Sequence, residues 1–300
     1  MKFFVYDQNK INLYDKDDFK FTIKPFPLNF ESFKKFSHQE CNYFIVPVKI
    51  KNKNKIISEK KIQILLNQLE FYEKNKEKHV FFITGDNHEE IDKIKDSIIF
   101  QNSICYYSKN LPLHYNALVF PNQIREINQS YFDISFLGNL NFPLRENIKK
   151  KLEKNFNLKI NISEFDYWNF NKNKKIKEIS KINYFNLMNN SKFILCPRGN
   201  ALNSIRFFET LSFGKIPILI SDTIKLPLKS KINYDKICLK IKEKNLDEIC
   251  DKVKYFMENN DLNLISKECR KIWENYFKED KFNYFVETSI LEKRQKLKFL

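Results

Sequence analysis

The segment 196–222, CPRGNALNSIRFFETLSFGKIPILISD, brings two guanidinium groups and a carboxylate close together. Arg198 lies in a predicted loop, and Arg206 and Glu209 are three residues apart on one face of the helix predicted after it. A guanidinium group offers phosphate oxygens a planar fork of donors, and a carboxylate can accept hydrogen bonds from both hydroxyls of a ribose. The pattern favours a site for a nucleoside diphosphate, with Glu209 on the ribose. The alternative is a surface ion pair between Arg206 and Glu209.

The elements around these residues form a predicted strand–helix–strand unit. The apolar runs KFILC and IPILIS predict buried strands on either side of the helix. Asn203 or Ser204 can cap that helix. A helix N-terminus carries free N–H groups and a partial positive charge, which favour an anion. We therefore expect Asn203 and Ser204 to bind the diphosphate together with Arg198 and Arg206.

Glycine is rare in this chain, so its positions are informative. The sequence has four glycines in 300 residues, against an average of about 7 %. Gly85, Gly138 and Gly199 lie at the C-terminal ends of predicted strands, where parallel sheets bind ligands. A residue without a Cβ atom lets the backbone come close to another group there. Gly214 is expected to follow the helix as a C′ residue.

A second phosphate-binding element is predicted around Gly138. In ISFLGNLNFPLRENI, a buried strand runs into Gly138 and Asn139, and a helix that carries Arg145 follows. In a parallel sheet the C-terminal end of this strand lies at the same edge as the end of the strand before Arg198. Gly138, Asn139 and Arg145 are therefore candidate donor-binding residues. The alternative for Arg145 is an ordinary position on the helix surface.

Apolar runs and helical patterns alternate along the chain, which predicts an α/β fold. The runs are mostly continuous, as is typical of strands buried on both faces of a parallel sheet. Strands are expected at 3–7, 43–48, 79–85, 104–108 and 117–121, and then at 133–139, 158–163, 192–196, 216–221 and 236–241.

Two sets of strand–helix units indicate two domains. We expect an N-terminal domain over residues 1–128, a second domain over 129–275 and a C-terminal helix over 276–300. The polar stretch 121–130 is the expected boundary. The Lys- and Asn-rich stretch 168–181 is expected to be an exposed loop.

The composition limits the classes of function. The formal net charge is +16, from 53 Lys and Arg against 37 Asp and Glu, which suggests nucleic acid, an anionic membrane surface or a phosphorylated substrate as partner. The alternative is a lysine-rich solvated surface. The six cysteines are scattered without a CxxC pair, so we expect neither zinc nor disulfides. The N-terminus is interpreted as neither a signal peptide nor a membrane anchor.

Together these motifs resemble the exostosin-type glycosyltransferases (glycosyltransferase family 47). The shared features are the CPRG turn, the Ser-x-Arg-x-x-Glu helix and the Gly-x-Ile-Pro strand that ends in Ser-Asp. Weaker similarities at 43–48, 79–89 and 134–148 extend the resemblance over most of residues 40–242. The flanks carry no matching signature.

The resemblance implies a GT-B fold, in which two Rossmann-like domains face each other across a cleft and the last helices cross back to the first domain. It implies that the second domain holds a UDP- or GDP-linked sugar donor and that the first domain holds the acceptor. It also implies an inverting reaction without a metal or another cofactor. In such a reaction, guanidinium and N–H groups stabilise the leaving diphosphate.

An inverting transfer also needs a base for the acceptor hydroxyl. The stretch GDNHE, directly after a predicted strand, supplies Asp86 as the first candidate and His88 as the second. Asp7 ends the first predicted strand. The alternative for Asp86 is a turn-forming residue after Gly85. The remaining histidines are expected to be structural or exposed.

The sequence thus predicts a glycosyltransferase for a surface-glycan or lipid-linked acceptor. It is expected to be cytoplasmic and peripheral at the inner face of the membrane, where a basic surface is attracted to anionic head groups. No nucleic-acid partner is expected, because the sequence carries no motif that we recognise for one. Two alternatives stay open: a basic polyanion- or nucleic-acid-binding protein, and a non-catalytic scaffold.

Overall fold

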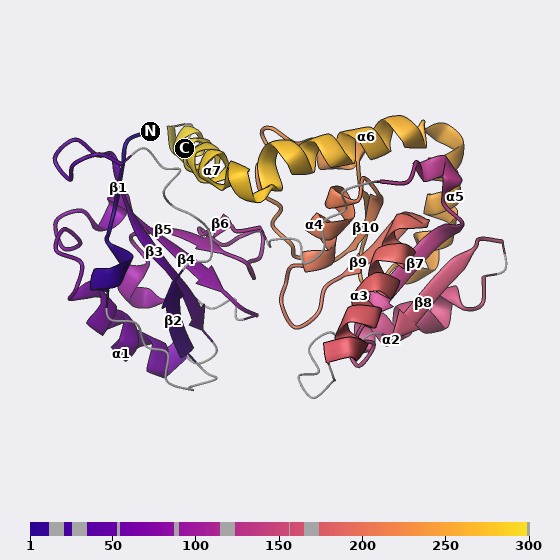
Figure 1. The fold of residues 1–300 in the computed structure, drawn as a ribbon, viewed down its shortest axis with the longest axis horizontal. Helices are drawn as coiled ribbons and strands as arrows, with labels where there is room; N and C mark the ends of the chain where they lie inside the picture. The colour runs from indigo at the N-terminus through magenta and orange to yellow at the C-terminus, as the bar shows by residue number, and fades with distance from the viewer. Residues whose placement is uncertain are drawn as a thin grey trace.

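The computed structural model describes residues 1–11, 21–25, 35–52, 55–86, 90–114, 124–155, 157–164 and 174–298. In this part of the chain, two mainly parallel sheets lie side by side, one from each half of the sequence (Figure 1). The α/β class predicted from the alternating apolar runs is confirmed.

The first sheet comes from the N-terminal half. Within the described residues its strands are β1 (Phe3–Val5), β2 (Phe21–Pro25), β3 (Tyr43–Asn52), β4 (His79–Thr84), β5 (Ile98–Gln101) and β6 (Leu111–Pro112). The order β1-β3-β4-β5-β6 is parallel throughout, and β2 pairs with β3 in the antiparallel sense. Helix α1 (Lys55–Leu66) covers one face, where Ile62 and Leu65 pack into the same core as Val46 and Phe81.

Three strands expected in this half are confirmed as β1, β3 and β4. The run 104–108 is not a strand: Ile104 and Cys105 are buried in the loop after β5, and the two tyrosines that follow are exposed. The apolar residues of this run therefore belong to a loop whose first half is buried. The expected strand at 117–121 lies outside the described residues.

The second sheet is parallel throughout. Its strands are β7 (Phe132–Gly138), β8 (Ile160–Glu164), β9 (Ser191–Pro197), β10 (Ile216–Ile220) and β11 (Leu239–Ile241). They pair in the order β11-β10-β9-β7-β8, which is a doubly wound arrangement. All five strands expected in this half are confirmed.

Helices connect and follow these strands. They are α2 (Pro143–Leu152), α3 (Lys174–Asn189), α4 (Ile205–Ser212), α5 (Ile249–Asn259), α6 (Leu262–Ile272) and α7 (Phe282–Lys298). Short 3-10 turns lie at Gln8–Lys10, Lys76–Lys78, Asp92–Ile94, Ile127–Gln129, Tyr234–Lys236, Leu246–Glu248 and Glu279–Lys281, and a π-turn at Trp273–Phe277 follows α6. Gly214 follows α4 with φ +59°, as a C′ residue does.

The expectation of an exposed loop at 168–181 is wrong from Lys174 onward, where α3 begins. Residues 168–173 lie outside the described part of the chain. The helix is held at its C-terminal half, where Tyr184 and Met188 are buried one turn apart. The Lys-rich first half of the helix conceals this apolar spacing when the segment is judged by its composition.

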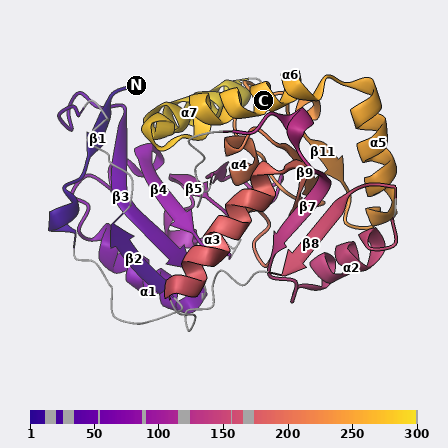
Figure 2. The same cartoon turned by 45° about the vertical axis from the view of Figure 1, so that its right-hand side comes forward.

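The final helices join the two halves of the molecule. Figure 2 shows α6 and α7 running along one side of both sheets. The ring of Phe282 lies 5.6 Å from that of Phe82, and the ring of Phe285 lies 5.9 Å from that of Phe100. The crossing back of the last helix onto the first sheet is therefore confirmed. One hydrophobic cluster runs from this contact through the π-turn to Phe208 of α4.

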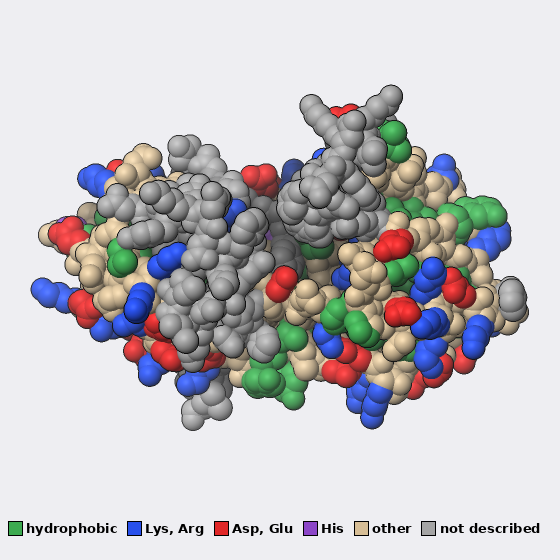
Figure 3. Space-filling view, turned by 90° about the horizontal axis from the view of Figure 1, so that it is seen from below, with side chains coloured by type: hydrophobic (Ala, Val, Ile, Leu, Met, Phe, Trp, Pro, Cys, Tyr) green, Lys and Arg blue, Asp and Glu red, His purple; other side chains and the backbone are tan. Residues whose placement is uncertain are grey.

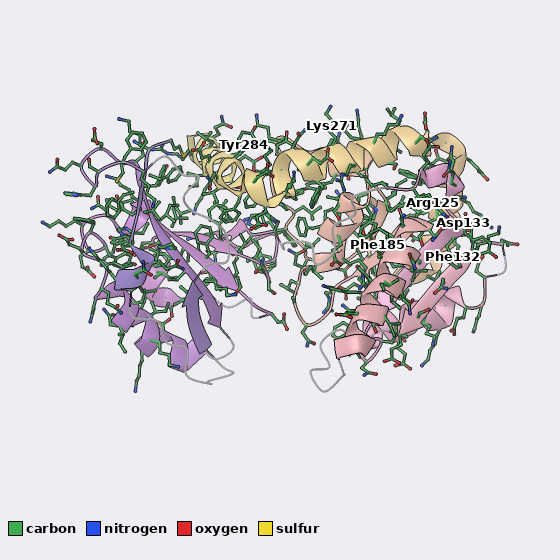
Figure 4. The ribbon with its side chains drawn as sticks, viewed as in Figure 1. Arg125, Phe132, Asp133, Phe185, Lys271 and Tyr284 are labelled. Carbon is green, nitrogen blue, oxygen red and sulfur yellow. The ribbon has the colours of Figure 1, made fainter. Side chains whose placement is uncertain are left out.

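The segment that enters the second domain is fastened to it by a buried lysine. Lys215 is 0 % exposed, and its Nζ donates to the carbonyl oxygen of Arg125 and to Ser130 Oγ, at 3.1 Å each. Arg125 lies beside Phe132 and Asp133 at the start of β7 (Figure 4). This contact is at the opposite end of the strand from Gly138.

The surface is mixed in charge. On the face seen in Figure 3, described Lys and Arg side chains lie among Asp and Glu rather than forming one basic field. All six cysteines are free, and five of them are buried. In the ranges that the structure describes, no helix is both long enough and apolar enough to cross a membrane.

Candidate donor-binding site

The candidate site lies where the strand order of the second sheet reverses. From β7 the chain moves outward to β8, and from β9 it moves the other way to β10. Doubly wound sheets bind ligands at such a switch point, outside the C-terminal ends of the strands. Here β7 ends at Gly138, and β9 ends at Pro197, directly before Arg198 and Gly199.

Two guanidinium groups converge on one aromatic ring at this edge. The Arg206 Cζ lies 4.5 Å from the centre of the Phe136 ring, and the Arg145 Cζ lies 5.6 Å from the same centre. Arg206 comes from the first turn of α4 and Arg145 from the first turn of α2. Phe136 thus provides a face on which cations from two helices are held.

Two glycines leave room for these arginines. A Cβ atom on Gly138 would lie 3.0 Å from Arg206 Nη1, and a Cβ atom on Gly199 would lie 3.0 Å from Arg145 Nη2. Both distances are shorter than ordinary contacts. The prediction that other atoms lie close to the backbone at these two glycines is confirmed. The atoms that lie there are the guanidinium groups of the protein's own arginines. Asn139 contributes through its backbone, because its carbonyl oxygen accepts a bond of 3.0 Å from Arg145 Nη1.

Arg145 carries a charge that the described part of the chain does not neutralise. Burial, together with the nearby Arg206 charge, lowers the pKa of Arg145 to about 10. Its Nε is buried and has no hydrogen-bond partner among the described residues. At neutral pH Arg145 is still protonated, so this strand edge has excess positive charge and an unused donor. An anion would satisfy both.

Arg206 is oriented by a tyrosine and a glutamate. Its Nε donates to the Tyr184 hydroxyl at 3.2 Å, and this hydroxyl donates to Glu209 Oε2 at 2.5 Å. Burial alone would lower the pKa of Arg206, but its interactions with Tyr184 and Glu209 outweigh this effect and the pKa rises. Burial raises the pKa of Tyr184 well above its usual value, so its hydroxyl stays protonated.

The position of Glu209 therefore differs from the one expected of a ribose ligand. The residue is 1 % exposed, and its carboxylate faces Tyr184 inside the domain. The alternative of a surface ion pair with Arg206 is also wrong, because a phenol lies between the two charged groups and the carboxylate is buried.

Arg198 also differs from the expectation of a free phosphate ligand. Its Nε and Nη2 donate to the two oxygens of Glu243 at 2.5 and 2.8 Å. This carboxylate follows β11 and is fixed in turn by Asp222, whose Oδ1 accepts from the backbone N–H of Glu243 at 2.9 Å. The fork of Arg198 is thus occupied by a carboxylate in this structure.

Asn203 and Ser204 lie at the junction with the first domain. They are 5 % and 7 % exposed. Asn203 Nδ2 donates to the carbonyl oxygen of Asn102 at 3.2 Å, and its Oδ1 accepts from the N–H of Ser204 at 2.7 Å. Asn203 therefore joins the loop before α4 to the loop after β5, and the N–H of Ser204 is occupied by Asn203 rather than open to a ligand.

Asp86, the first candidate base, is exposed after β4 and close to the same junction. Its carbonyl oxygen accepts a bond of 2.9 Å from Ser103 Oγ, which accepts from the N–H of Leu202 at 3.0 Å. His88, the second candidate, lies outside the described residues. Asp7 caps a 3-10 turn by accepting from the N–H of Asn9, which explains its position without catalysis.

The residues that sequence reasoning missed are Tyr184, Phe136 and Glu243. Tyr184 lies 22 residues before Arg206 on a helix that the composition concealed. In the sequence, Phe136 is indistinguishable from an ordinary buried strand residue. Glu243 lies 45 residues after Arg198, beyond any local spacing signal. Among the described residues, no group of three or more His, Cys, Asp or Glu side chains is arranged to hold a metal ion.

The fold and this edge define a class: an α/β protein of two sheets in which the second sheet carries a pair of arginines at its switch point. Sequence comparison is more specific, because residues 50–256 match the model of the exostosin GT47 domain. The chain belongs to the exostosin GT47 family. The resemblance seen in the CPRG segment is thereby confirmed.

Known relatives agree with this assignment. Exostosin-1 of Drosophila melanogaster is 31 % identical over 118 residues, which are 39 % of this chain and 15 % of that protein. The Exostosin-1 homolog of Caenorhabditis elegans is 38 % identical over 68 residues, which are 23 % of this chain and 18 % of that protein. The matched region is thus a small part of these relatives. Among solved structures, TarM is similar with a TM-score of 0.39 and 12 % identity, over 85 % of this chain and 54 % of that chain.

Proposed function

We propose that this protein is an inverting, metal-independent glycosyltransferase that uses a UDP- or GDP-linked sugar. The observation that carries the proposal is the positive charge of Arg145, which no described residue neutralises, beside the guanidinium of Arg206 at the switch point of the second sheet. A diphosphate supplies the missing negative charge. Membership of the exostosin GT47 family supports the same reaction class.

In the proposed reaction, the acceptor hydroxyl oxygen attacks the anomeric carbon of the donor sugar. The bond from this carbon to the diphosphate oxygen breaks, and the nucleoside diphosphate leaves with the electron pair. Arg145 and Arg206 stabilise the charge that develops on the leaving group. Asp86 takes the proton of the acceptor hydroxyl. Its support is its exposed position beyond β4, next to the loop that leads to α4.

The acceptor is proposed to be a surface glycan or a lipid-linked precursor, reached from the cytoplasmic face of the membrane. The support is the net charge of +16, which attracts anionic head groups. Sedimentation with vesicles that contain an anionic lipid, against neutral vesicles, tests this part alone. Equal recovery in the supernatant in both cases would contradict it.

The central experiment measures donor hydrolysis and binding with the purified protein. A panel of nucleotide sugars is screened for release of UDP or GDP, and the affinity of the best nucleotide is measured by calorimetry. Arg145→Ala and Arg206→Ala are each expected to weaken that affinity by about tenfold or more, because each removes a charged donor to phosphate. The matched control is Arg294→Ala, which removes one exposed guanidinium from α7.

The outcomes separate the three candidate functions. Turnover with one nucleotide sugar, lost in Asp86→Asn with donor binding retained, supports the enzyme. Nucleotide binding without turnover for any donor would favour the non-catalytic scaffold. Binding of an oligonucleotide in preference to every nucleotide would favour the polyanion-binding protein.

A further inference from the structure

We infer that Tyr184 is a positioning residue for Arg206, and that Glu209 is a buried counter-charge rather than a ligand of the ribose. The inference rests on the proposed function of this edge as a diphosphate site. It assigns the roles of two side chains that lie behind the site and do not face a ligand.

The geometry gives Tyr184 a position between the two charges. Its hydroxyl is the only polar atom of the side chain, and it accepts from Arg206 Nε at 3.2 Å and donates to Glu209 Oε2 at 2.5 Å. Tyr184 and Glu209 are 5 % and 1 % exposed. A buried chain of this kind has fixed polarity, because the guanidinium can only donate and the carboxylate can only accept.

Two aromatic rings complete the restraint on Arg206. Its Cζ lies 4.5 Å from the centre of the Phe136 ring and 5.3 Å from the centre of the Tyr184 ring. Its Nε is used by the hydroxyl, while Nη1 and Nη2 lie against Gly138. The terminal nitrogens are therefore the part of the fork that is directed to the strand end where a diphosphate would bind.

Burial explains why a carboxylate is needed behind the phenol. A guanidinium group that is largely removed from water loses solvation energy. Glu209 offsets this cost through the Tyr184 hydroxyl, and does so from the side away from Gly138. A ribose role would require the same carboxylate to be open to a ligand, which its 1 % exposure does not allow.

The test compares two ligands that share a diphosphate but differ in the ribose. The affinities of inorganic pyrophosphate and of the better of UDP and GDP are measured by calorimetry for each variant. Tyr184→Phe keeps the ring and removes the hydroxyl. This variant is expected to bind both ligands about tenfold more weakly, because the lost hydrogen bond involves a charged group.

Glu209→Gln distinguishes a counter-charge from a ribose ligand. The amide oxygen can still accept from Tyr184, and the ribose contact of a carboxylate would be lost. We expect the ratio of nucleotide to pyrophosphate affinity to stay at its wild-type value. A selective loss of nucleotide affinity, with pyrophosphate affinity unchanged, would overturn the inference and restore Glu209 to the ribose.

The matched control is Tyr234→Phe. Tyr234 is also a buried tyrosine of this domain, at 3 % exposure, and its hydroxyl donates to the carbonyl oxygen of Pro227 at 2.8 Å. This variant loses a buried hydrogen bond and should bind both ligands like the wild type. The two variants are compared at assay temperatures that lie equally far below their own melting temperatures. A loss of stability is then not mistaken for a loss of positioning.

The result separates this inference from the proposed function. If the wild type binds nucleotide and pyrophosphate and Tyr184→Phe binds both with unchanged affinity, the positioning role is wrong while the donor site stands. If the wild type binds neither UDP, GDP nor pyrophosphate, the donor site itself is wrong and the inference falls with it.

Discussion

Arg198 and Glu243 form a bidentate ion pair at the edge of the candidate site, with nitrogen–oxygen distances of 2.5 and 2.8 Å. Arg198 belongs to the CPRG turn, whereas Glu243 follows the last strand of the second sheet. The pair is partly buried, and the carboxylate raises the pKa of Arg198 by accepting its hydrogen bonds. A diphosphate at the proposed site would therefore meet an arginine that already has an anionic partner.

Replacing Glu243 should strengthen nucleotide binding. In Glu243→Gln the Arg198 fork loses its charged competitor, so we expect the affinity for UDP or GDP to rise by roughly threefold to tenfold, while the free energy of unfolding falls by about 1 kcal/mol. Calorimetry and urea denaturation measure the two quantities. Asp247→Asn changes the net charge equally at an exposed pair with Lys151 and should leave affinity unchanged. Weaker binding in Glu243→Gln would mean that the ion pair shapes the site.

Methyl groups at the two strand-end glycines should displace the arginines. Neither Gly138 nor Gly199 has positive φ, so alanine can adopt the backbone and the effect is local. Gly138→Ala puts its Cβ 3.0 Å from both Arg206 Nη1 and the Phe136 ring, whereas Gly199→Ala meets only Arg145 within 3.7 Å. We expect nucleotide affinity to fall about tenfold in the first and less in the second, since Arg206 is held more tightly. Equal, unchanged affinities would show that neither guanidinium contacts the ligand.

The sequence predicted the parts of this site that lie within one strand–helix–strand unit. The strand ends, the C′ glycine and the arginines of α2 and α4 follow from local pattern, because turn residues and apolar runs fix their places. The partners of those arginines do not. Glu243 meets Arg198 through the pairing of β10 with β11, and Tyr184 meets Arg206 because α3 packs beside β7 and β9, which no spacing within a segment reveals.

The same limit explains the burial of Glu209. A helical spacing of three residues puts Arg206 and Glu209 on one face, but it does not say whether that face is turned to solvent or to the domain interior. The neighbouring helix α3 decides this by covering the carboxylate with Tyr184. The prediction of a strand at 104–108 is wrong for a related reason: Ile104 and Cys105 belong to a loop of the first domain that is buried against the second, where Cys105 makes only an isolated bridge to Ile224.

Lys215 should make the free energy of unfolding rise with pH in the alkaline range. Burial, with a contribution from Arg125, lowers the pKa of this lysine to about 8. Between pH 8 and the ordinary value near 10.5 the unfolded chain binds more protons than the folded one, so folding gains stability as pH rises through this window. Relative to Lys215→Met, which cannot titrate, the wild-type free energy of unfolding should increase by about 1 kcal/mol per pH unit above pH 8. Denaturation at pH 7.5, 8.5 and 9.5 checks the difference, and a constant difference would contradict it.

His79 should make the first domain sensitive to acid. It is 0 % exposed, its Nδ1 lies 2.7 Å from the carbonyl oxygen of Asn75, and its Nε2 lies 2.9 Å from the Tyr6 hydroxyl. Because the Asn75 carbonyl only accepts, Nδ1 carries the proton and Nε2 accepts from Tyr6. Burial lowers the pKa of His79 to about 4, so the unfolded chain binds more protons between pH 6.5 and 4, and stability is lost as pH falls through this range.

The expected loss is about 3 kcal/mol when integrated over the full window, and urea denaturation at pH 7, 6, 5 and 4.5 measures it. His79→Gln removes the titrating group and should flatten the profile, even though it is less stable at pH 7 because the packing against Phe44 is reduced. His38→Gln is the matched control, since His38 stacks on the same aromatic cluster but is exposed, and it should keep the wild-type slope. A wild-type slope in His79→Gln would assign the acid sensitivity to carboxylates instead.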